Sequence, residues 1–240
     1  MGGGAGAGGR MGGVVTGGRG DVLEGVLGDV LDGVLDGVLD GVPVGGRALV
    51  AVDGRGASGK STFAALLAAR ARPRPVVLLH VDDFFHPPHV RHARGRMSPE
   101  GFWLDTYDYG ALVATALEPL TRAGSGSFRR TSSTPPDGAE RAPDDALVVV
   151  EGTFLLRDEL VRFWDVAVFL DVPQDEAERR MRARGRLDEA LADQLLARYD
   201  GAQRLYFAHA RPWERATLVV DTTDPTAPVV VDAGQAHAAR

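Results

Sequence analysis

The sequence predicts an α/β fold in which a mostly parallel central sheet lies between two layers of helices, as a three-layer α/β/α sandwich. Three observations support this prediction. Short apolar runs rich in Val and Leu recur along the chain, helical patterns separate them, and a glycine-rich turn joins the first run to the first helical pattern. Apolar runs without polar alternation are typical of parallel strands that are buried on both faces.

The composition narrows the classes of protein to consider. The chain has 240 residues, of which 44% are hydrophobic and 25% charged, as in a soluble globular domain. A net charge of -6 does not favour a nucleic-acid-binding surface, and the lack of cysteine excludes disulfides, thiolate metal sites and cysteine nucleophiles. No apolar run approaches the roughly 20 residues that span a bilayer. We therefore expect a cytoplasmic protein with neither a membrane nor a nucleic-acid partner.

The N-terminal region has an unusual composition. Residues 1–20 are mostly glycine, so we expect a disordered tail there. Residues 21–45 contain a repeat whose Val-Leu pairs recur every four residues, which places them along one face of a helix. Each glycine in such a helix costs about 1 kcal/mol relative to alanine, so the helix should be weak. We interpret it as a helix lying against the domain, with a docking role or a homo-oligomer contact as the alternative.

The elements of the main domain, residues 46–224, alternate along the chain. The predicted strands are residues 48–52, 76–81, 147–150, 166–170 and 217–220. The predicted helices are residues 61–71, 107–123, 157–163, 173–183 and 187–208. Residues 123–145 are rich in Gly, Ser, Pro and charge, which predicts a loop with a short hairpin near 128–131. The Pro- and Ala-rich residues 225–240 are expected to form a flexible tail.

The strongest motif follows the first predicted strand. It reads Gly54-Arg55-Gly56-Ala57-Ser58-Gly59-Lys60-Ser61 and fits the pattern G-x-x-x-x-G-K-[ST]. Glycines allow successive backbone N–H groups to turn toward phosphate oxygens, and the following helix N-terminus adds partial positive charge. The lysine of this motif reaches the β- and γ-phosphates, and its final hydroxyl is a ligand for Mg²⁺. We therefore predict a P-loop that, with the adjoining Thr62, binds ATP and Mg²⁺.

Acidic residues follow two other predicted strands. Asp82 and Asp83 come after the second strand, and Glu151 comes after the third. Because the carboxyl ends of parallel strands form one ligand-binding edge, these acids should lie near the P-loop. We predict that Asp82 and Glu151, with Ser61, hold Mg²⁺, and that Asp82 accepts the proton of an attacking hydroxyl. Asp83 is more typical of a cap or turn.

With these motifs, residues 47–224 resemble the uridine kinase group of P-loop kinases, which includes phosphoribulokinase and bacterial pantothenate kinase. The residues that carry the resemblance are Asp82-Asp83-Phe84-Phe85, Tyr107-Asp108-Tyr109, Glu151-Gly152 and the arginine-rich run 179–186. The resemblance implies that Asp82 is the catalytic base and that Asp108 holds sugar hydroxyls. It also implies an arginine-rich lid, with Arg184 and Arg186 as candidates for stabilising the transferred phosphoryl group beside Lys60.

The same resemblance implies an ATP-dependent kinase whose acceptor is a small-molecule hydroxyl, first of all the 5′-hydroxyl of uridine or a related nucleoside. The chain departs from the family pattern in two places: Phe85 replaces a tyrosine, and the hairpin reads Phe128-Arg129-Arg130 without the family's histidine. We assign Phe85 and Arg129 to the acceptor site. Pantothenate or another small alcohol is an alternative acceptor. A non-catalytic nucleotide sensor is a further alternative, although a sensor needs neither a base nor a lid.

Overall fold

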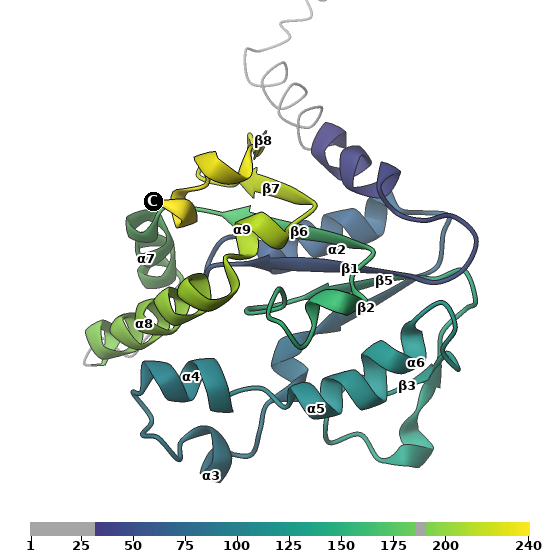
Figure 1. Ribbon diagram of the computed structural model, residues 1–240, viewed down its shortest axis with the longest axis horizontal. Coiled ribbons are helices and arrows are strands. Elements are labelled where there is room, and N and C mark those ends of the chain that lie inside the picture. Colours follow the sequence, from purple (N-terminus) through teal and green to yellow (C-terminus); the bar gives the residue numbers. More distant parts are fainter. Residues whose placement is uncertain (1–31, 186–190) are drawn as a thin grey trace, which may run out of the picture.

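The computed structural model describes residues 32–185 and 191–240. A six-stranded sheet has the order β2-β5-β1-β6-β7-β8 (Figure 1). Its strands are β1 (Ala48–Gly54), β2 (Val76–His80), β5 (Leu147–Glu151), β6 (Val166–Asp171), β7 (Leu218–Asp221) and β8 (Val229–Val231). Five of them are parallel and β8 is antiparallel to β7. The predicted parallel sheet is therefore confirmed, and each predicted strand is present.

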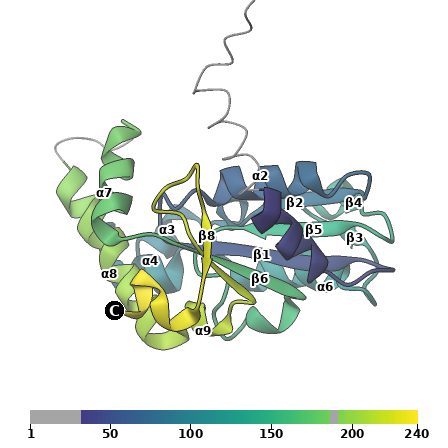
Figure 2. The same cartoon turned by 90° about the horizontal axis from the view of Figure 1, so that it is seen from above.

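Helices cover both faces of the sheet. One face carries the helix of residues 32–40 and α2 (Lys60–Arg70), which share a core with β1 (Figure 2). The other face carries α4 (Pro99–Asp105), α5 (Tyr109–Leu112), α6 (Glu118–Leu120), α8 (Ala192–Ala210) and α9 (Pro212–Arg215). Two further α-helices are α3 (Pro88–Arg91) and α7 (Gln174–Ala183). The three-layer architecture is therefore confirmed.

The helix of residues 32–40 belongs to the folded domain. Its side chains Val34, Leu35 and Val38 are buried against the sheet, and the Asp36 carboxylate pairs with the Arg70 guanidinium of α2 at 2.7 Å. Val38 is fully buried, so tertiary packing supplies the stability that the glycine-rich sequence lacks. The predictions for residues 1–31, the Gly-rich tail included, lie outside the described residues.

The prediction of a helix at residues 157–163 is wrong. Only the 3-10 turn Val161–Phe163 forms there, and residues 153–160 make turns. The backbone N–H groups of Phe154 and Leu156 donate to the buried carboxylate of Asp53, at 3.1 and 3.0 Å. These bonds hold the chain before residue 157 in a turn, which a helical pattern in the sequence does not reveal.

Other predicted helices are present with altered bounds. The helix expected at 107–123 forms as α5, a π-helical segment (Val113–Leu117) and α6. The last predicted helix corresponds to α8, and its predicted start at 187–190 lies outside the described residues. The predicted hairpin joins β3 (Ser127–Phe128) to β4 (Glu140–Arg141), so its loop is longer than expected.

The C-terminal segment is ordered, which corrects the expectation of a flexible tail over residues 225–240. Strand β8 extends the sheet, and Ala236 beyond it is fully buried. The buried carboxylate of Asp171 accepts hydrogen bonds from the backbone N–H groups of His237 and Ala238. Two features therefore hold this segment in place: the edge of β7, which pairs with β8, and the buried Asp171 carboxylate, which requires hydrogen-bond donors.

No helix within the described ranges combines the length and apolarity that a bilayer crossing requires.

Candidate active site

The P-loop connects β1 to α2 through a backbone that requires glycine at its first position. Gly54 has a φ of +151°, and a Cβ atom there would lie 2.4 Å from the carbonyl oxygen of Leu170 in β6. No larger residue fits without moving the neighbouring strand. Gly59 also has a positive φ, of +95°, immediately before α2 begins. The loop thus turns from the sheet into the helix N-terminus as the motif predicts.

A buried acid anchors the start of this loop. The Asp53 carboxylate accepts hydrogen bonds from the N–H groups of Gly54, Phe154 and Leu156 and from the Tyr206 hydroxyl. Burial raises the pKa of Asp53, and these hydrogen bonds oppose the shift. Asp53 is a residue that sequence reasoning missed, because a single acid before a glycine carries no signal of its three distant donors, Phe154, Leu156 and Tyr206.

Lys60 is enclosed within the loop. Its ammonium donates to the carbonyl oxygens of Gly54 and Arg55, at 3.1 and 2.9 Å. Burial lowers the pKa of Lys60, and the nearby carboxylates Glu151, Asp53 and Asp82 oppose that shift. A cation in this position is placed to exchange weak carbonyl contacts for stronger bonds to phosphate oxygens.

Glu151 lies at the end of β5 and faces the first turn of α2. The Ser61 hydroxyl donates to its Oε1 at 3.0 Å, and Nδ1 of His80 lies 2.6 Å from the same oxygen. Strand register brings these groups together, since Glu151 is paired with Val52 on one side and with His80 on the other. The pairing of the strands therefore fixes the position of Glu151 relative to His80.

The oxygen donors at this edge fit a magnesium ion. Ser61 supplies a hydroxyl, and Glu151 and Asp82 supply carboxylates within one cavity. Mg²⁺ prefers such oxygen ligands and usually completes its shell with water and substrate phosphates. The described residues contain no group of three His, Cys, Asp or Glu side chains that could hold a metal alone. Such a site would therefore depend on phosphate oxygens for the rest of its ligands.

The cavity beside the P-loop, which we call the main cavity, has a volume of about 390 Å³ and contains Asp82 in its wall. Asp82 lies in the 3-10 turn Val81–Phe84 directly after β2. The Tyr107 hydroxyl donates to Asp82 Oδ1 at 2.9 Å. Burial, and then the neighbouring Asp82 charge, raises the pKa of Tyr107 well above its usual value, so the phenol remains a proton donor to Asp82. The rings of Phe85 and Phe102 line the same cavity.

The structure brings together most of the residues predicted for the site. The main cavity is lined by Arg55, Gly56, Ala57, Lys60, Ser61, Asp82, Phe85, Glu151 and Arg184. Asp108 does not line it. Its Oδ1 accepts the N–H of Ala111 at 2.8 Å as the cap of α5. Arg129 does not line it either, and its Nη1 donates to the carbonyl of Thr134 in the hairpin at 2.9 Å. Arg186 lies outside the described residues.

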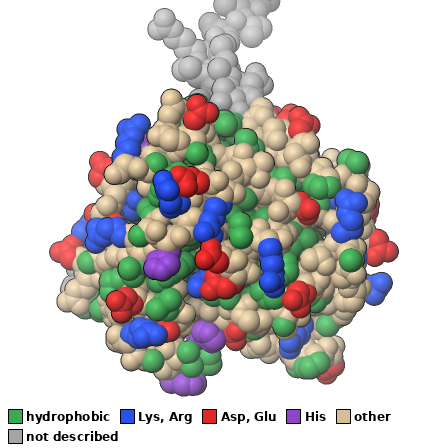
Figure 3. Space-filling view, in the orientation of Figure 1, with side chains coloured by type: hydrophobic (Ala, Val, Ile, Leu, Met, Phe, Trp, Pro, Cys, Tyr) green, Lys and Arg blue, Asp and Glu red, His purple; other side chains and the backbone are tan. Residues whose placement is uncertain are grey.

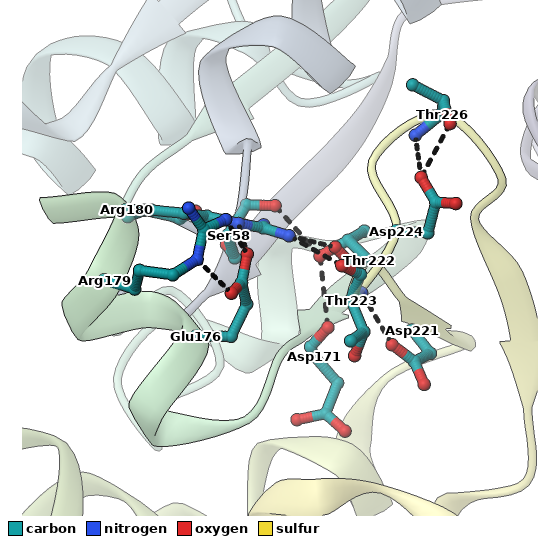
Figure 4. Close-up of polar contacts among 11 residues, drawn as sticks. Ser58, Asp171, Glu176, Arg179, Arg180, Asp221, Thr222, Thr223, Asp224 and Thr226 are labelled. Carbon is teal, nitrogen blue, oxygen red and sulfur yellow. Dashed lines mark hydrogen bonds and ion pairs between the residues drawn. The ribbon is translucent and has the colours of Figure 1, made fainter. Parts of the chain in front are cut away.

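A second cavity of about 240 Å³ lies behind the P-loop. Its lining includes Ser58, Gly59, Thr62, Phe63, Arg180, Arg184, Thr222, Pro225 and Pro228. Arg180 of α7 donates through Nη2 to the carbonyls of Thr222 and Thr223, both at 2.9 Å, and the Thr222 hydroxyl donates to the Ser58 carbonyl at 3.0 Å (Figure 4). Arg180 belongs to the arginine-rich run, and Thr222 belongs to residues 219–225, which resemble the last strand and loop of the uridine kinase group. Helix α7, the P-loop and the segment after β7 thus form one hydrogen-bonded wall.

The surface charge of the molecule is mixed. On the face shown in Figure 3, Lys and Arg side chains are interspersed with Asp and Glu rather than gathered into one basic patch. The net charge of -6 agrees with this distribution. This face therefore does not resemble the extended basic surface that a nucleic acid requires.

The fold and the phosphate-binding loop define the class of protein. The chain is an α/β protein with a nucleotide-binding P-loop between the first strand of a parallel sheet and the helix that follows it. No family model matches it, and no curated protein matches it.

Solved structures confirm the resemblance to the uridine kinase-like group of P-loop kinases at the level of the fold. A "possible uridine kinase" from Bacillus stearothermophilus has a TM-score of 0.61 and 23% sequence identity, covering 81% of this chain and 98% of that one. A candidate fructose transport system kinase from Silicibacter sp. TM1040 has a TM-score of 0.54 and 26% identity, covering 78% and 94%. Both similarities extend over nearly the whole of the other chain.

Proposed function

We propose that this protein is an ATP-dependent kinase that transfers the γ-phosphoryl group to a hydroxyl of a small molecule. The observation that carries the proposal is one cavity whose lining holds both Lys60 and Ser61 of the P-loop and the carboxylate of Asp82. A phosphate donor bound by the P-loop and a hydroxyl acceptor beside Asp82 would therefore meet in this cavity. A protein that only senses nucleotides has no need of the base.

The P-loop residues would bind the triphosphate. Lys60 would move from the carbonyls of Gly54 and Arg55 to phosphate oxygens, which accept stronger, charge-assisted hydrogen bonds. Ser61, Glu151 and Asp82 would hold Mg²⁺, which when bound supplies positive charge to the phosphates. We assign the adenine ring to the second cavity, which is lined by Ser58 and Gly59 of the P-loop, by Arg180 and Thr222, and by two prolines.

The reaction requires one proton transfer and one displacement. The acceptor oxygen forms a bond to the γ-phosphorus while the bond from that phosphorus to the bridging oxygen breaks and ADP leaves. Asp82 takes the proton of the acceptor hydroxyl, and the Tyr107 hydroxyl holds the carboxylate in place. Lys60 and Arg184, which share the cavity, stabilise the charge that spreads over the transferred group.

The family resemblance proposes uridine or a related nucleoside as the acceptor. Phe85 and Phe102 offer flat apolar surfaces, which suit a ring or a sugar face. Asp108 and Arg129, the residues assigned to the nucleoside, contact other parts of the chain instead. The geometry therefore supports an alcohol kinase more directly than a uridine kinase, and pantothenate or another small alcohol stays an alternative. The cytoplasmic location and the homo-oligomer stay predictions.

A panel of acceptors tests this proposal. Purified protein is incubated with ATP and Mg²⁺ and with uridine, cytidine, pantothenate, a ketose or glycerate, and ADP and the mass of the product are measured. We expect ADP only with an acceptor that gains one phosphate, and no product from Lys60→Met. ADP release that is equal with and without every acceptor, alongside tight ATP binding, would favour the nucleotide sensor.

A further inference from the structure

Two arginines stack on aromatic rings that line the main cavity, and neither arginine is itself a lining residue. The Arg91 guanidinium carbon is 4.8 Å from the centre of the Phe85 ring, and that of Arg198 is 4.6 Å from the centre of the Phe102 ring. Phe85 also stacks on Tyr107 at 5.2 Å, so Arg91, Phe85 and Tyr107 form one column beside Asp82. Arg91 comes from α3 and Arg198 from α8, which are distant in sequence.

The positive charge of these arginines is not neutralised by the described part of the chain. None of the ion pairs there includes Arg91, Arg96 or Arg198, whereas Arg94, just after α3, pairs with Asp105 at 2.9 Å. The buried Nε atoms of Arg91 and Arg198 have no hydrogen-bond partner within the described residues. A half-buried guanidinium that lacks an acceptor is costly to retain, which indicates a ligand that supplies one.

The two charges flank one group of aromatic rings: Phe85, which carries Arg91, stacks on Tyr107, and the Phe102 ring, which carries Arg198, lies 6.4 Å from Tyr107 between ring centres. Burial lowers the pKa of Arg198; nearby Tyr199 and Tyr107 oppose the shift, and the charges of Arg91 and Arg96 add to it. The Tyr107 hydroxyl donates to the proposed base Asp82, so this group of rings lies at the acceptor end of the cavity. Stacking on an aromatic ring also leaves the edge of a guanidinium free to donate hydrogen bonds in its plane.

We propose that the acceptor of this kinase carries an anionic group, a phosphate or a carboxylate, which Arg91 and Arg198 bind beside these aromatic rings. The inference rests on the proposed function and narrows its substrate class. Phosphate and carboxylate oxygens match the in-plane donors of two guanidinium groups. A neutral nucleoside would leave both cations without an anionic partner among the described residues, so an anionic sugar or an anionic alcohol fits this chain better than uridine.

Anion binding is tested apart from turnover. The P-loop is first saturated with Mg²⁺ and a non-hydrolysable ATP analogue, and the melting temperature is followed as inorganic phosphate is added, with chloride at equal ionic strength as the blank. We expect phosphate to raise the melting temperature of the wild type but not of Arg91→Gln or Arg198→Gln. Arg94→Gln removes an equal charge from an arginine that already has a partner, and should keep the response. No phosphate response, or one equal in all four proteins, overturns the inference.

Matched acceptors test the substrate class and separate phosphate from carboxylate. Ribose is compared with ribose 5-phosphate, and pantothenol with pantothenate, with uridine as the neutral nucleoside. We expect turnover of an anionic member, and a KM for it that rises roughly 10- to 100-fold in Arg198→Gln with little change in kcat, as for one lost charged hydrogen bond. A neutral member that is preferred, or a KM insensitive to both arginine variants, overturns the inference.

The two proposals fail in different ways. If phosphate stabilises the analogue-loaded protein through both arginines but no acceptor is phosphorylated, the anion site stands and the kinase assignment fails. If uridine is phosphorylated efficiently and the phosphate response is absent, the kinase assignment stands and the anion site fails. Binding of the ATP analogue by each variant, measured by its own thermal shift, shows that the variants are folded.

Discussion

Replacing Asp82 by Asn separates the proposed base from its surroundings. Asn keeps an Oδ1 that accepts the Tyr107 hydroxyl, now 2.9 Å from the carboxylate, but it cannot take a proton. We expect kcat to fall by on the order of 10², which is about 2.7 kcal/mol of transition-state stabilisation at 1.36 kcal/mol per tenfold change. Asp82 is exposed, so the free energy of unfolding should change by less than about 0.5 kcal/mol.

The neighbouring acid provides a matched control. Asp83 is exposed and loses the same charge in Asp83→Asn, but its side chain does not line the main cavity. It lies within the 3-10 turn 81–84, as one of its two expected roles, a cap or a turn residue, requires, and its side chain makes no cap. Its backbone carbonyl accepts the N–H of Ser132, a bond that the substitution keeps. We expect kcat to stay within about twofold of the wild type, as for an ordinary surface change.

Steady-state kinetics and thermal melts on both variants decide the assignment. A double-mutant cycle with Tyr107→Phe adds a second criterion. The phenylalanine alone should lower kcat by roughly tenfold, and it should cost much less in the Asp82→Asn background, because the two groups act as one unit. Near-normal kcat in Asp82→Asn would refute the role of this acid, and loss of activity in Asp83→Asn alone would show that the wrong acid was chosen.

Three further predictions concern the loop, its anchor and the N-terminal helix. Lys60→Met should abolish transfer and weaken ATP binding while leaving the melting temperature close to that of the wild type, because the variant loses the cation of the cradle; normal turnover would exclude this loop as the ATP site. Asp53→Asn should lower the free energy of unfolding by about 1–3 kcal/mol, because its amide hydrogens face donors. Burial raises the pKa of Asp53, so the folded state binds a proton on this carboxyl more tightly than the unfolded state does. The free energy of unfolding therefore falls as pH rises through the raised pKa, and urea melts across pH should show a smaller fall in the variant, which lacks this carboxyl. Val38→Ala should cost about 2 kcal/mol with unchanged kcat, whereas the exposed Val44→Ala should cost less than about 0.5 kcal/mol, and equal urea melts would show that residues 32–40 do not support the core.

Features that depend on neighbouring residues were predictable from the sequence. Each parallel strand is buried on both faces, so its run of Val and Leu is visible without knowing its partners. The P-loop is a contiguous motif whose backbone turn binds phosphate, and Asp82 and Glu151 follow strands that must end at the same edge of the sheet. For these elements, a few consecutive residues are enough to determine the local structure or the type of site.

Features that depend on distant partners required the tertiary structure. The turns at residues 153–160 follow from amides that bond to Asp53, about a hundred residues earlier in the chain, and the order of the C-terminus follows from the edge of β7 and from Asp171. Family resemblance assigned Asp108 to the acceptor, but its local hydrogen bond makes it a helix cap. That Arg91 of α3 and Arg198 of α8 stack on rings of the same cavity is likewise invisible in sequence, because the role of an arginine charge depends on neighbours that only the tertiary structure supplies.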